Sequence, residues 1–424
     1  MAGRQIPRST GGFKKRYVGI VRTCSENQSQ HKGFHGENVR RILLNDITLR
    51  DGEQSPGVNF FPEEKLEIAR QLVNMNVPII EAGFAVASES DFQGVNRIAM
   101  ELGSPDGPTI CSMARAHKRD IECAYEALRP AAKPRIQVVL ATSDLHLEYK
   151  LNLTREQVID LTRETVAFAR SLVEDVEFAA EDATRSDLDF LCSVFTVAGE
   201  SGARTLEIPD TVGYSIPTEY ASIVKTVLAK VAGVKDMVVS THCHDDLGLA
   251  TANTLAGLAA GAGQAECTIN GIGERAGNAS MEEVVMALKT RPTQFGVQAD
   301  INTKAILETS KLVEALSRMR VAPNKAIVGE NAFKHESGIH QHGMLCNSET
   351  YQIIEPETVG ARKFDLMLGK LSGKHALRTK IMELSLDIGP QDFDKVYLSF
   401  KDLSAKKKMI VDDDIVNLVN RIVG

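Results

Sequence analysis

From Arg40 to about residue 295, short apolar runs alternate with longer amphipathic segments. The runs are rich in β-branched residues, which is typical of buried strands. Eight can be delimited: RILLNDIT (41–48), PIIEAGF (78–84), TICSMA (109–114), RIQVVLA (135–141), VEFAA (176–180), RTLEIPD (204–210), DMVVSTHCH (236–244) and AECTIN (265–270).

The segments between the runs carry the period of an amphipathic helix. In PEEKLEIARQLVNM (62–75), apolar residues recur at helical spacing, at Leu66, Ala69, Leu72 and Val73. In TREQVIDLTRETVAFARSL (154–172), Thr154 and Gln157 have the spacing of a capping box. A further helix is predicted over SMEEVVMALK (280–289), after the eighth run.

Eight strand–helix units in succession indicate an α/β fold with a parallel sheet covered by helices. Eight is also the number that closes a (β/α)8 TIM barrel, and residues 40–295 are close to the usual length of about 250 residues. We therefore expect a closed barrel over 40–295. A doubly wound open sheet is the structural alternative.

The chain changes character on both sides of this region. Residues 296–345 read as a helix followed by a loop rich in Gly, His and Asn, and the chain ends in an acidic and apolar helix, DDDIVNLVNRIV. We expect a smaller, mostly helical accessory region over 296–424. Residues 1–39 are basic and poor in acidic residues, which indicates a flexible extension or a cleaved organelle-targeting segment.

Composition narrows the class of function. The chain has 424 residues, 43% of them hydrophobic, and a formal net charge of -7, which gives no reason to expect nucleic acid or an anionic membrane as partner. No run of about 18 apolar residues is present to span a bilayer. The seven cysteines form no CxxC pair, so we expect reduced thiols and a cytoplasmic protein, or an organellar one if residues 1–39 are a transit segment.

Polar residues follow several predicted strands. In a (β/α)8 barrel the active site lies at the carboxyl ends of the strands. The stretches at these ends are TLRDGEQ (48–54), ED (181–182), DTVG (210–213), HCHDD (242–246) and NGIGERAGN (270–278). Together they bring carboxylates, imidazoles, an arginine and glycine-rich turns to one face of the barrel.

His242 and His244 are the centre of a predicted metal site. Residues i and i+2 of a strand point to the same face, so both imidazoles can reach one ion while Cys243 points away. A hard or borderline ion would also take oxygen ligands, and Asp51 and Asn278 follow the neighbouring strands. Such a site fits Mg²⁺, Mn²⁺ or Zn²⁺ and leaves room for two oxygens of a 2-oxo acid.

Three further features at the strand ends have both a structural and a functional interpretation. Arg50 could simply pair with Asp51, or it could stabilise an enolate or alkoxide. Glu181 could be a solvated charge or an acid/base group. The glycines of GIGERAGN could only make turns, or could allow close approach of the backbone to a phosphate or carboxylate.

TLRDGEQ, HCHDDLG, TINGIGERAGNASMEEVVMALK (268–289) and HESGIHQHG (335–343) together resemble the 2-isopropylmalate synthases, a family of barrel metallolyases. The resemblance covers residues 40–424. It implies that Asp51, His242, His244 and Asn278 bind the divalent metal. The activity it implies is a metal-assisted Claisen condensation of acetyl-CoA with 3-methyl-2-oxobutanoate to 2-isopropylmalate and CoA, the first step of leucine biosynthesis.

The resemblance also implies roles for other side chains. Arg50 would stabilise the enolate or alkoxide oxygen, and Thr211 would bind the carboxylate of the 2-oxo acid. Glu181 and His340 would be the catalytic pair, with Tyr351 assisting His340. In this family His340 and Tyr351 come from the other subunit, so a homodimer with shared active sites is expected.

Some positions depart from the family pattern, namely Ile47, Ala85, Asp144 and His342. Residues near 81–88 and 113–116 line the acceptor pocket in relatives, so the same chemistry on another 2-oxo acid is the nearest alternative: a methylthioalkylmalate, citramalate or homocitrate synthase. Asp51 disfavours the last of these. Alternatives from other classes are a C–C lyase and a non-catalytic binding barrel. Typical members continue into a leucine-binding regulatory domain, whereas this sequence stops at Gly424. We therefore expect either a form without leucine feedback or a truncated chain.

Overall fold

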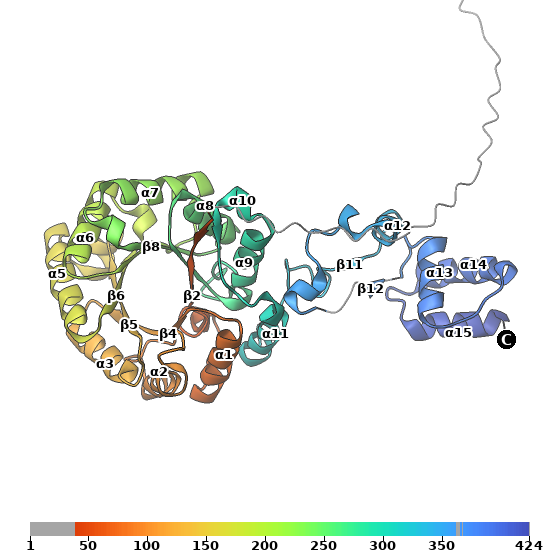
Figure 1. Ribbon diagram of the computed structural model, residues 1–424, viewed down its shortest axis with the longest axis horizontal. Coiled ribbons are helices and arrows are strands. Elements are labelled where there is room, and N and C mark those ends of the chain that lie inside the picture. Colours follow the sequence, from red (N-terminus) through yellow and green to blue (C-terminus); the bar gives the residue numbers. More distant parts are fainter. Residues whose placement is uncertain (1–38, 362–364, 367, 424) are drawn as a thin grey trace, which may run out of the picture. The chain divides into compact units, whose positions relative to one another are not determined.

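The computed structural model describes residues 39–361, 365–366 and 368–423. The predicted extension over 1–39 therefore lies, apart from its last residue, outside the described residues. Eight parallel strands close into one barrel (Figure 1). In barrel order they are β2 (Leu43–Asp46), β3 (Ile79–Glu81), β4 (Thr109–Arg115), β5 (Pro134–Ala141), β6 (Asp175–Glu181), β7 (Thr205–Asp210), β8 (Val238–Cys243) and β9 (Gln264–Cys267).

The closed barrel confirms the predicted fold class, and the doubly wound alternative is wrong. Each of the eight predicted apolar runs overlaps a strand of the barrel. Helices surround the barrel (Figure 1). They are α1 (Pro62–Asn74), α2 (Glu89–Leu102), α3 (Lys118–Leu128), α4 (Asp144–His146), α5 (Arg155–Leu172), α6 (Leu188–Glu200), α7 (Pro217–Lys230), α8 (Ala250–Ala260), α9 (Met281–Thr290) and α10 (Pro292–Phe295).

Helix α5 shows how local sequence sets an element's start. The Gln157 N–H donates to Thr154 Oγ1 over 3.3 Å, and the Thr154 N–H donates to Gln157 Oε1 over 2.8 Å. These two bonds satisfy N–H groups that have no partner within the helix. The capping box predicted from the sequence is thus confirmed.

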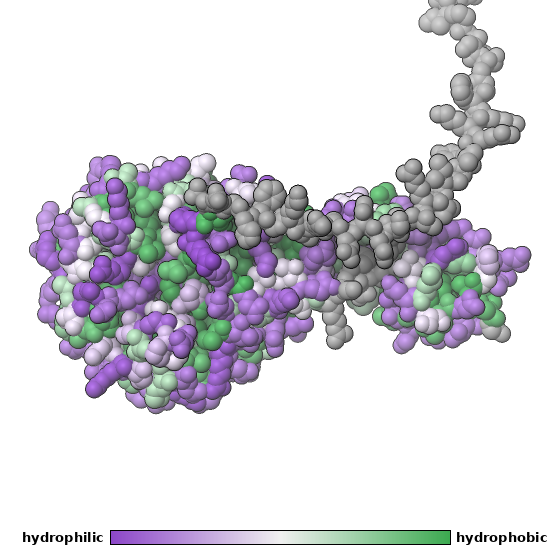
Figure 2. Space-filling view, viewed as in Figure 1, coloured by the Kyte–Doolittle hydropathy of each residue, from purple (hydrophilic) through white to green (hydrophobic). Residues whose placement is uncertain are grey.

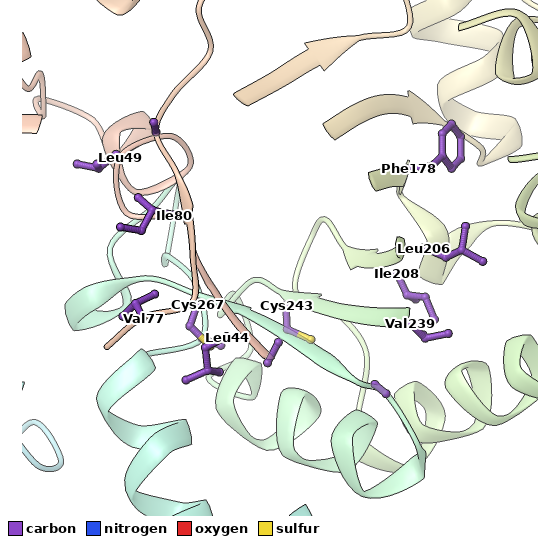
Figure 3. Packing of buried hydrophobic residues seen from close by; sticks show 14 of the residues in the cluster. Leu44, Leu49, Val77, Ile80, Phe178, Leu206, Ile208, Val239, Cys243 and Cys267 are labelled. Carbon is purple, nitrogen blue, oxygen red and sulfur yellow. The ribbon is translucent and has the colours of Figure 1, made fainter. Parts of the chain in front are cut away.

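Alternate residues of each strand face the helices and form the main hydrophobic core (Figure 3). Leu44, Ile80, Phe178, Leu206 and Val239 are all at most 2% exposed. Burying a side chain of this kind contributes about 1.5–3 kcal/mol relative to leaving it in water. Cys243 belongs to this core, so it does point away from the two histidines beside it.

The other residues of the strands face the barrel interior, and many of them are polar. They include Asn45, Glu81, Gln137, Glu177, Glu207, Ser240, Gln264 and Glu266, all buried. A TIM-barrel interior is usually filled by branched apolar side chains. Buried carboxylates require hydrogen-bonding partners. These inward-facing side chains can therefore hydrogen-bond to polar groups at the carboxyl ends of the strands.

After the barrel, β10 (Val297–Gln298) pairs in parallel with β1 (Arg40–Arg41). Helix α11 (Ile306–Ser317) follows, then β11 (Lys334–His335), which pairs with β12 (Asp365–Leu366). Between them lies α12 (Gly338–Cys346). The sequence predicted a loop here, because Gly338 and Gly343 lower helix propensity.

Helices α13 (Lys374–Glu383), α14 (Pro390–Lys406) and α15 (Asp412–Val423) share a small core of their own. Helix α15 is the helix predicted from the acidic and apolar sequence DDDIVNLVNRIV. The six cysteines in the described part of the chain are free. Polar and charged residues are interspersed with small apolar patches on the face shown in Figure 2. Of the helices described, none has the length and apolar character required to span a bilayer.

Candidate active site

A cavity of about 330 Å³ lies at the carboxyl ends of the barrel strands, where the active site was predicted. Its lining combines charged, imidazole, amide and apolar groups. The residues are Arg50, Asp51, Gln54, Phe84, Met113, Arg115, Gln137, Val139, Lys150, Ala179, Glu181, Glu207, Pro209, Thr211, His242, His244, Glu274 and Arg275.

Asp51, His242 and His244 meet at this cavity. The Nε2 atoms of the two histidines are 3.1 Å apart. Asp51 Oδ2 lies 3.9 Å from His242 Nε2 and 4.0 Å from His244 Nε2. The three side chains are buried and offer ligand atoms close enough together for one metal ion.

Asn278 reaches the same point from the loop after β9. Its Nδ2 donates to Asp51 Oδ1 over 2.6 Å, and its buried Oδ1 has no hydrogen-bonding partner in the described structure. An isolated bridge between His244 and Asn278 connects the two backbones. Gly273 packs directly on this pair, since a Cβ there would lie 2.2 Å from Asn278 Nδ2. The glycine-rich loop thus allows its backbone to pack against the ligand set.

The other ring nitrogen of His242 is held from inside the barrel. His242 Nδ1 lies 3.0 Å from Glu207 Oε1 and 3.0 Å from Glu266 Oε2. An ionised carboxylate only accepts hydrogen bonds, so these contacts favour hydrogen on Nδ1 and leave Nε2 free to face Asp51. Neither glutamate is among the site residues predicted from the sequence. The available signal was an acid at an inward-facing position of an apolar strand.

Burial and neighbouring charges shift the pKa of each of the three predicted ligands. Burial by itself would raise the pKa of Asp51, but Arg50 and the two histidines lower it well below its usual range. Burial lowers the pKa of His242, and its bonds to the two glutamates outweigh this and raise it. Burial and the neighbouring His242 lower the pKa of His244 to about 4, so this imidazole is neutral at pH 7.

Arg50 is fixed by two carboxylates. Its Nε donates to Glu81 Oε2 over 2.9 Å, and its Nη1 donates to Asp51 Oδ2 over 2.7 Å. The charges of both acids outweigh burial and hold the pKa of Arg50 above its usual value. The ion pair with Asp51 is therefore real, and Arg50 also lines the cavity. The two interpretations offered by the sequence are compatible.

Thr211 and Glu181 line another part of the cavity. Thr211 Oγ1 accepts a hydrogen bond of 2.9 Å from the Asp182 N–H, which leaves its own hydroxyl hydrogen available. Lys150 Nζ donates to both carboxylate oxygens of Glu181, over 2.5 and 2.8 Å. Lys150 lies in a π-helical segment, Leu147–Leu151, which the sequence analysis did not anticipate.

The two aspartates after His244 do not join the ligand group. Asp245 Oδ1 accepts a bond of 2.9 Å from the Ala250 N–H at the start of α8. Asp246 forms a two-pronged ion pair with Arg275, over 2.8 and 2.9 Å. Both therefore organise the loops at the rim of the cavity.

His340 and Tyr351 are not among the described residues that line the cavity. They stack on one another, with ring centroids 4.3 Å apart, and His335 lies edge-on to His340 at 6.3 Å. His340 is exposed, and Tyr351 is 45% exposed. The structure thus brings seven of the nine predicted site residues to the cavity or to Asp51, and the other two into a separate exposed pair.

Comparisons with known proteins agree with this architecture. Residues 41–313 match the family described as HMGL-like, and residues 327–408 match the family described as homocitrate synthase post-HMGL domain-like. The hydroxymethylglutaryl-CoA lyase of Pseudomonas aeruginosa, a solved structure, superposes with a TM-score of 0.57 at 18% identity, over 70% of this chain and 97% of that one. At this identity the likeness concerns the fold alone.

Two curated relatives are much closer in sequence. The 2-isopropylmalate synthase of Aquifex aeolicus is 50% identical over 380 residues, which cover 89% of this chain and 72% of that protein. The 2-isopropylmalate synthase 1 of Caldanaerobacter subterraneus is 49% identical over 377 residues, covering 89% of this chain and 94% of that protein. The chain belongs to the 2-isopropylmalate synthase family, and its barrel is of the HMGL-like type.

Proposed function

We propose that this protein condenses acetyl-CoA with 3-methyl-2-oxobutanoate to give 2-isopropylmalate and CoA, the first step of leucine biosynthesis. One observation carries the proposal: Asp51, His242, His244 and Asn278 converge beside Arg50 in a cavity of about 330 Å³. Membership in the 2-isopropylmalate synthase family supports the choice of reaction.

The residues present fit a divalent metal. Asn278 Oδ1 is buried without a partner, and the imidazole Nε2 atoms of His242 and His244 are only 3.1 Å apart. A cation at this point would use all three atoms and an oxygen of Asp51. One carboxylate, one amide and two imidazoles suit Mg²⁺, Mn²⁺ or Zn²⁺. When bound, the metal would supply Lewis-acid polarisation of the 2-oxo acid.

Arg50 is placed to stabilise developing negative charge. Glu81 and Asp51 engage two of the five N–H donors of the guanidinium, and the group lines the cavity. Fixed donors of this kind stabilise an oxyanion without reorganising during the reaction. The enolate oxygen of acetyl-CoA and the new alkoxide are the oxyanions that this reaction forms.

Thr211 and Glu181 would bind and activate the substrates. The hydroxyl hydrogen of Thr211 is free to donate to the carboxylate of the 2-oxo acid. Glu181 is held by Lys150 at the cavity wall, where it can orient or exchange a proton. Phe84, Met113 and Val139 give the cavity an apolar part that suits a branched acyl chain.

The remaining catalytic groups would come from a second subunit. His340 and Tyr351 form an exposed pair that is available to another chain. In the proposed dimer, His340 of one subunit enters the cavity of the other and takes part in removing the methyl proton of acetyl-CoA, with Tyr351 assisting. Each active site is then shared between two chains.

The proposed reaction joins the two substrates through a new carbon–carbon bond. Acetyl-CoA loses a methyl proton, and its methyl carbon forms a C–C bond with the carbonyl carbon of 3-methyl-2-oxobutanoate. The carbonyl oxygen becomes an alkoxide and takes up a proton. Water then cleaves the thioester, which releases CoA and the second carboxylate of 2-isopropylmalate.

Release of free CoA tests the proposal. The assay contains acetyl-CoA, Mg²⁺ or Mn²⁺, and one of a panel of 2-oxo acids. We expect 3-methyl-2-oxobutanoate to give the highest kcat/KM, above pyruvate and 2-oxoglutarate. No release with any acceptor would exclude a condensing enzyme, while a preference for another acceptor would move the protein to another branch of the family.

A further inference from the structure

A continuous hydrogen-bonded network lies inside the barrel beneath the predicted metal ligands. Its centre is the side-chain amide of Gln264 on β9. Arg135 on β5 donates from Nη1 to Gln264 Oε1 over 2.9 Å. Strands β5 and β9 are four places apart in the closed eight-stranded barrel, so this bond crosses the interior from one side to the other.

The network has a defined direction. An arginine side chain only donates hydrogen bonds, so Arg135 fixes Oε1 of Gln264 on its own side and turns the Nε2 hydrogens the other way. Gln264 Nε2 lies 2.8 Å from Glu177 Oε1 and 3.0 Å from Ser240 Oγ. Because Ser240 Oγ accepts from Gln264, its hydroxyl hydrogen is free for Glu266 Oε1, 3.2 Å away.

The network ends at His242, a predicted metal ligand, which it reaches through Glu266. Glu266 Oε2 lies 3.0 Å from His242 Nδ1. Ser240 donates to the other oxygen of Glu266, and Gln264 Nε2 lies 3.4 Å from the same oxygen. These donors keep the carboxylate an acceptor toward His242. The second glutamate at Nδ1, Glu207, accepts a bond of 2.7 Å from Gln137 Nε2. Hydrogen on Nδ1 leaves the lone pair of His242 on Nε2, the atom that faces Asp51.

We propose that Gln264, oriented by Arg135, is a positioning residue for the metal site, and that the network sets which ring nitrogen of His242 faces the ion. The inference rests on the proposed function, since it requires His242 to be a metal ligand. Groups that hydrogen-bond a metal-ligating histidine raise metal affinity by fixing its orientation and tautomer. Here the hydrogen-bonded support of His242 extends through Glu266 to Gln264 and Arg135.

The test compares Mn²⁺ binding by the metal-free full chain and four variants, with free Mn²⁺ followed by electron paramagnetic resonance. Gln264→Leu should weaken binding about 10- to 100-fold. Ser240→Ala removes the bond that Ser240 accepts from Gln264 and the bond that it donates to Glu266, and it should weaken binding about fivefold. CoA release should recover at saturating Mn²⁺ in both variants, because the network does not touch the substrates.

Asn45→Leu is the matched control. Asn45 is fully buried inside the same barrel and is paired in register with Glu266, yet neither its Nδ2 nor its Oδ1 has a hydrogen-bonding partner in the described structure. This variant should bind Mn²⁺ as the wild type does. Equal weakening in Asn45→Leu would show a general loosening of the barrel and would overturn the proposal.

Thermal unfolding of each metal-free variant by circular dichroism separates affinity from folding. If Gln264→Leu does not fold, Ser240→Ala decides the question. Wild-type Mn²⁺ affinity in folded Gln264→Leu and Ser240→Ala would contradict the role of the network. The fourth variant, His242→Ala, tests the metal site separately from the network. Wild-type Mn²⁺ binding in this variant would mean that His242 is not a metal ligand.

Discussion

At the scale of single residues, Arg50 depends on the planar geometry of its guanidinium. It donates to Glu81 and Asp51 from two different nitrogens and still lines the cavity. A lysine has one point charge on a flexible stem and cannot reproduce this arrangement. We expect Arg50→Lys to lower kcat about 100- to 1,000-fold, the usual cost of losing an oxyanion donor.

The measurement that checks this is steady-state CoA release. KM for the 2-oxo acid should change much less than kcat, because the lost interaction acts mainly in the transition state. A variant with wild-type kcat would show that Arg50 only holds Asp51 in place.

Thr211 offers a milder test of substrate binding. Its hydroxyl accepts from the Asp182 N–H and has one hydrogen left for a substrate carboxylate. Thr211→Val removes that hydrogen at nearly constant volume, and we expect kcat/KM for the 2-oxo acid to fall roughly 10- to 100-fold.

The control for this prediction is Thr211→Ser, which keeps the hydroxyl and should retain most of the activity. If valine and serine behave alike, the hydroxyl does not bind the substrate.

At the scale of elements, the loop from Asn270 to Asn278 connects β9 to the ligand group. Its Gly273 has no room for a side chain, since a Cβ would lie 2.2 Å from Asn278 Nδ2 and 3.2 Å from Asp51 Oδ1. Gly273→Ala must displace one of these ligands. We expect Mn²⁺ binding to weaken at least tenfold, roughly the effect of overpacking a tight site.

Gly373→Ala is the matched substitution for this test, because a Cβ at Gly373 meets nothing within 4 Å. Its Mn²⁺ affinity should equal that of the wild type. Unchanged affinity in Gly273→Ala would show that the loop can move away without disturbing the ligands.

Asp46, at the end of β2, makes the free energy of unfolding depend on pH. Asp46 accepts hydrogen bonds from the N–H and hydroxyl of Thr48, whose hydroxyl oxygen in turn accepts from the Ile269 N–H. Burial, with a smaller contribution from Glu282, raises the pKa of Asp46 to about 7. The folded state therefore binds a proton that the unfolded chain releases near its ordinary pKa of about 4.

It follows that Asp46 stabilises the folded state below about pH 4, and that this stabilisation is lost as the pH rises to about 7. We expect urea unfolding to show a free energy that falls over this range, with a shallower slope in Asp46→Asn. An equal slope in both proteins would contradict the raised pKa.

The elements were largely predictable from the sequence, whereas part of the site was not. Strand positions follow from apolar runs, and the spacing of His242 and His244 on a strand predicts their convergence. Glu207 and Glu266 stand in such runs, but their partners come from strands distant in sequence. Lys150 reaches Glu181 through a π-helical segment that no simple period indicates. The roles of these residues depend on contacts between segments that are far apart in the sequence.

At the scale of the whole molecule, the proposed dimer makes a quantitative prediction. Arg50→Lys disables the cavity, and His340→Ala disables the exposed pair. If each active site takes these residues from different subunits, a mixed dimer has one doubly altered site and one intact site. Random mixing after denaturation and refolding should then restore about one quarter of wild-type activity.

Size-exclusion chromatography with light scattering should show a dimer before and after mixing. If the mixture stays as inactive as its components, His340 and Arg50 belong to the same subunit's site. An active His340→Ala homodimer would instead show that His340 has no catalytic role.

The most direct test of the central claim measures metal content and CoA release on the same sample of His242→Ala. His242 is buried, and its Nε2 faces Asp51 and His244. We expect the variant, after dialysis against Mn²⁺, to contain much less than one equivalent of bound metal and to release no CoA above background, while circular dichroism shows a folded barrel. Full CoA release in a variant that holds no metal would contradict the account.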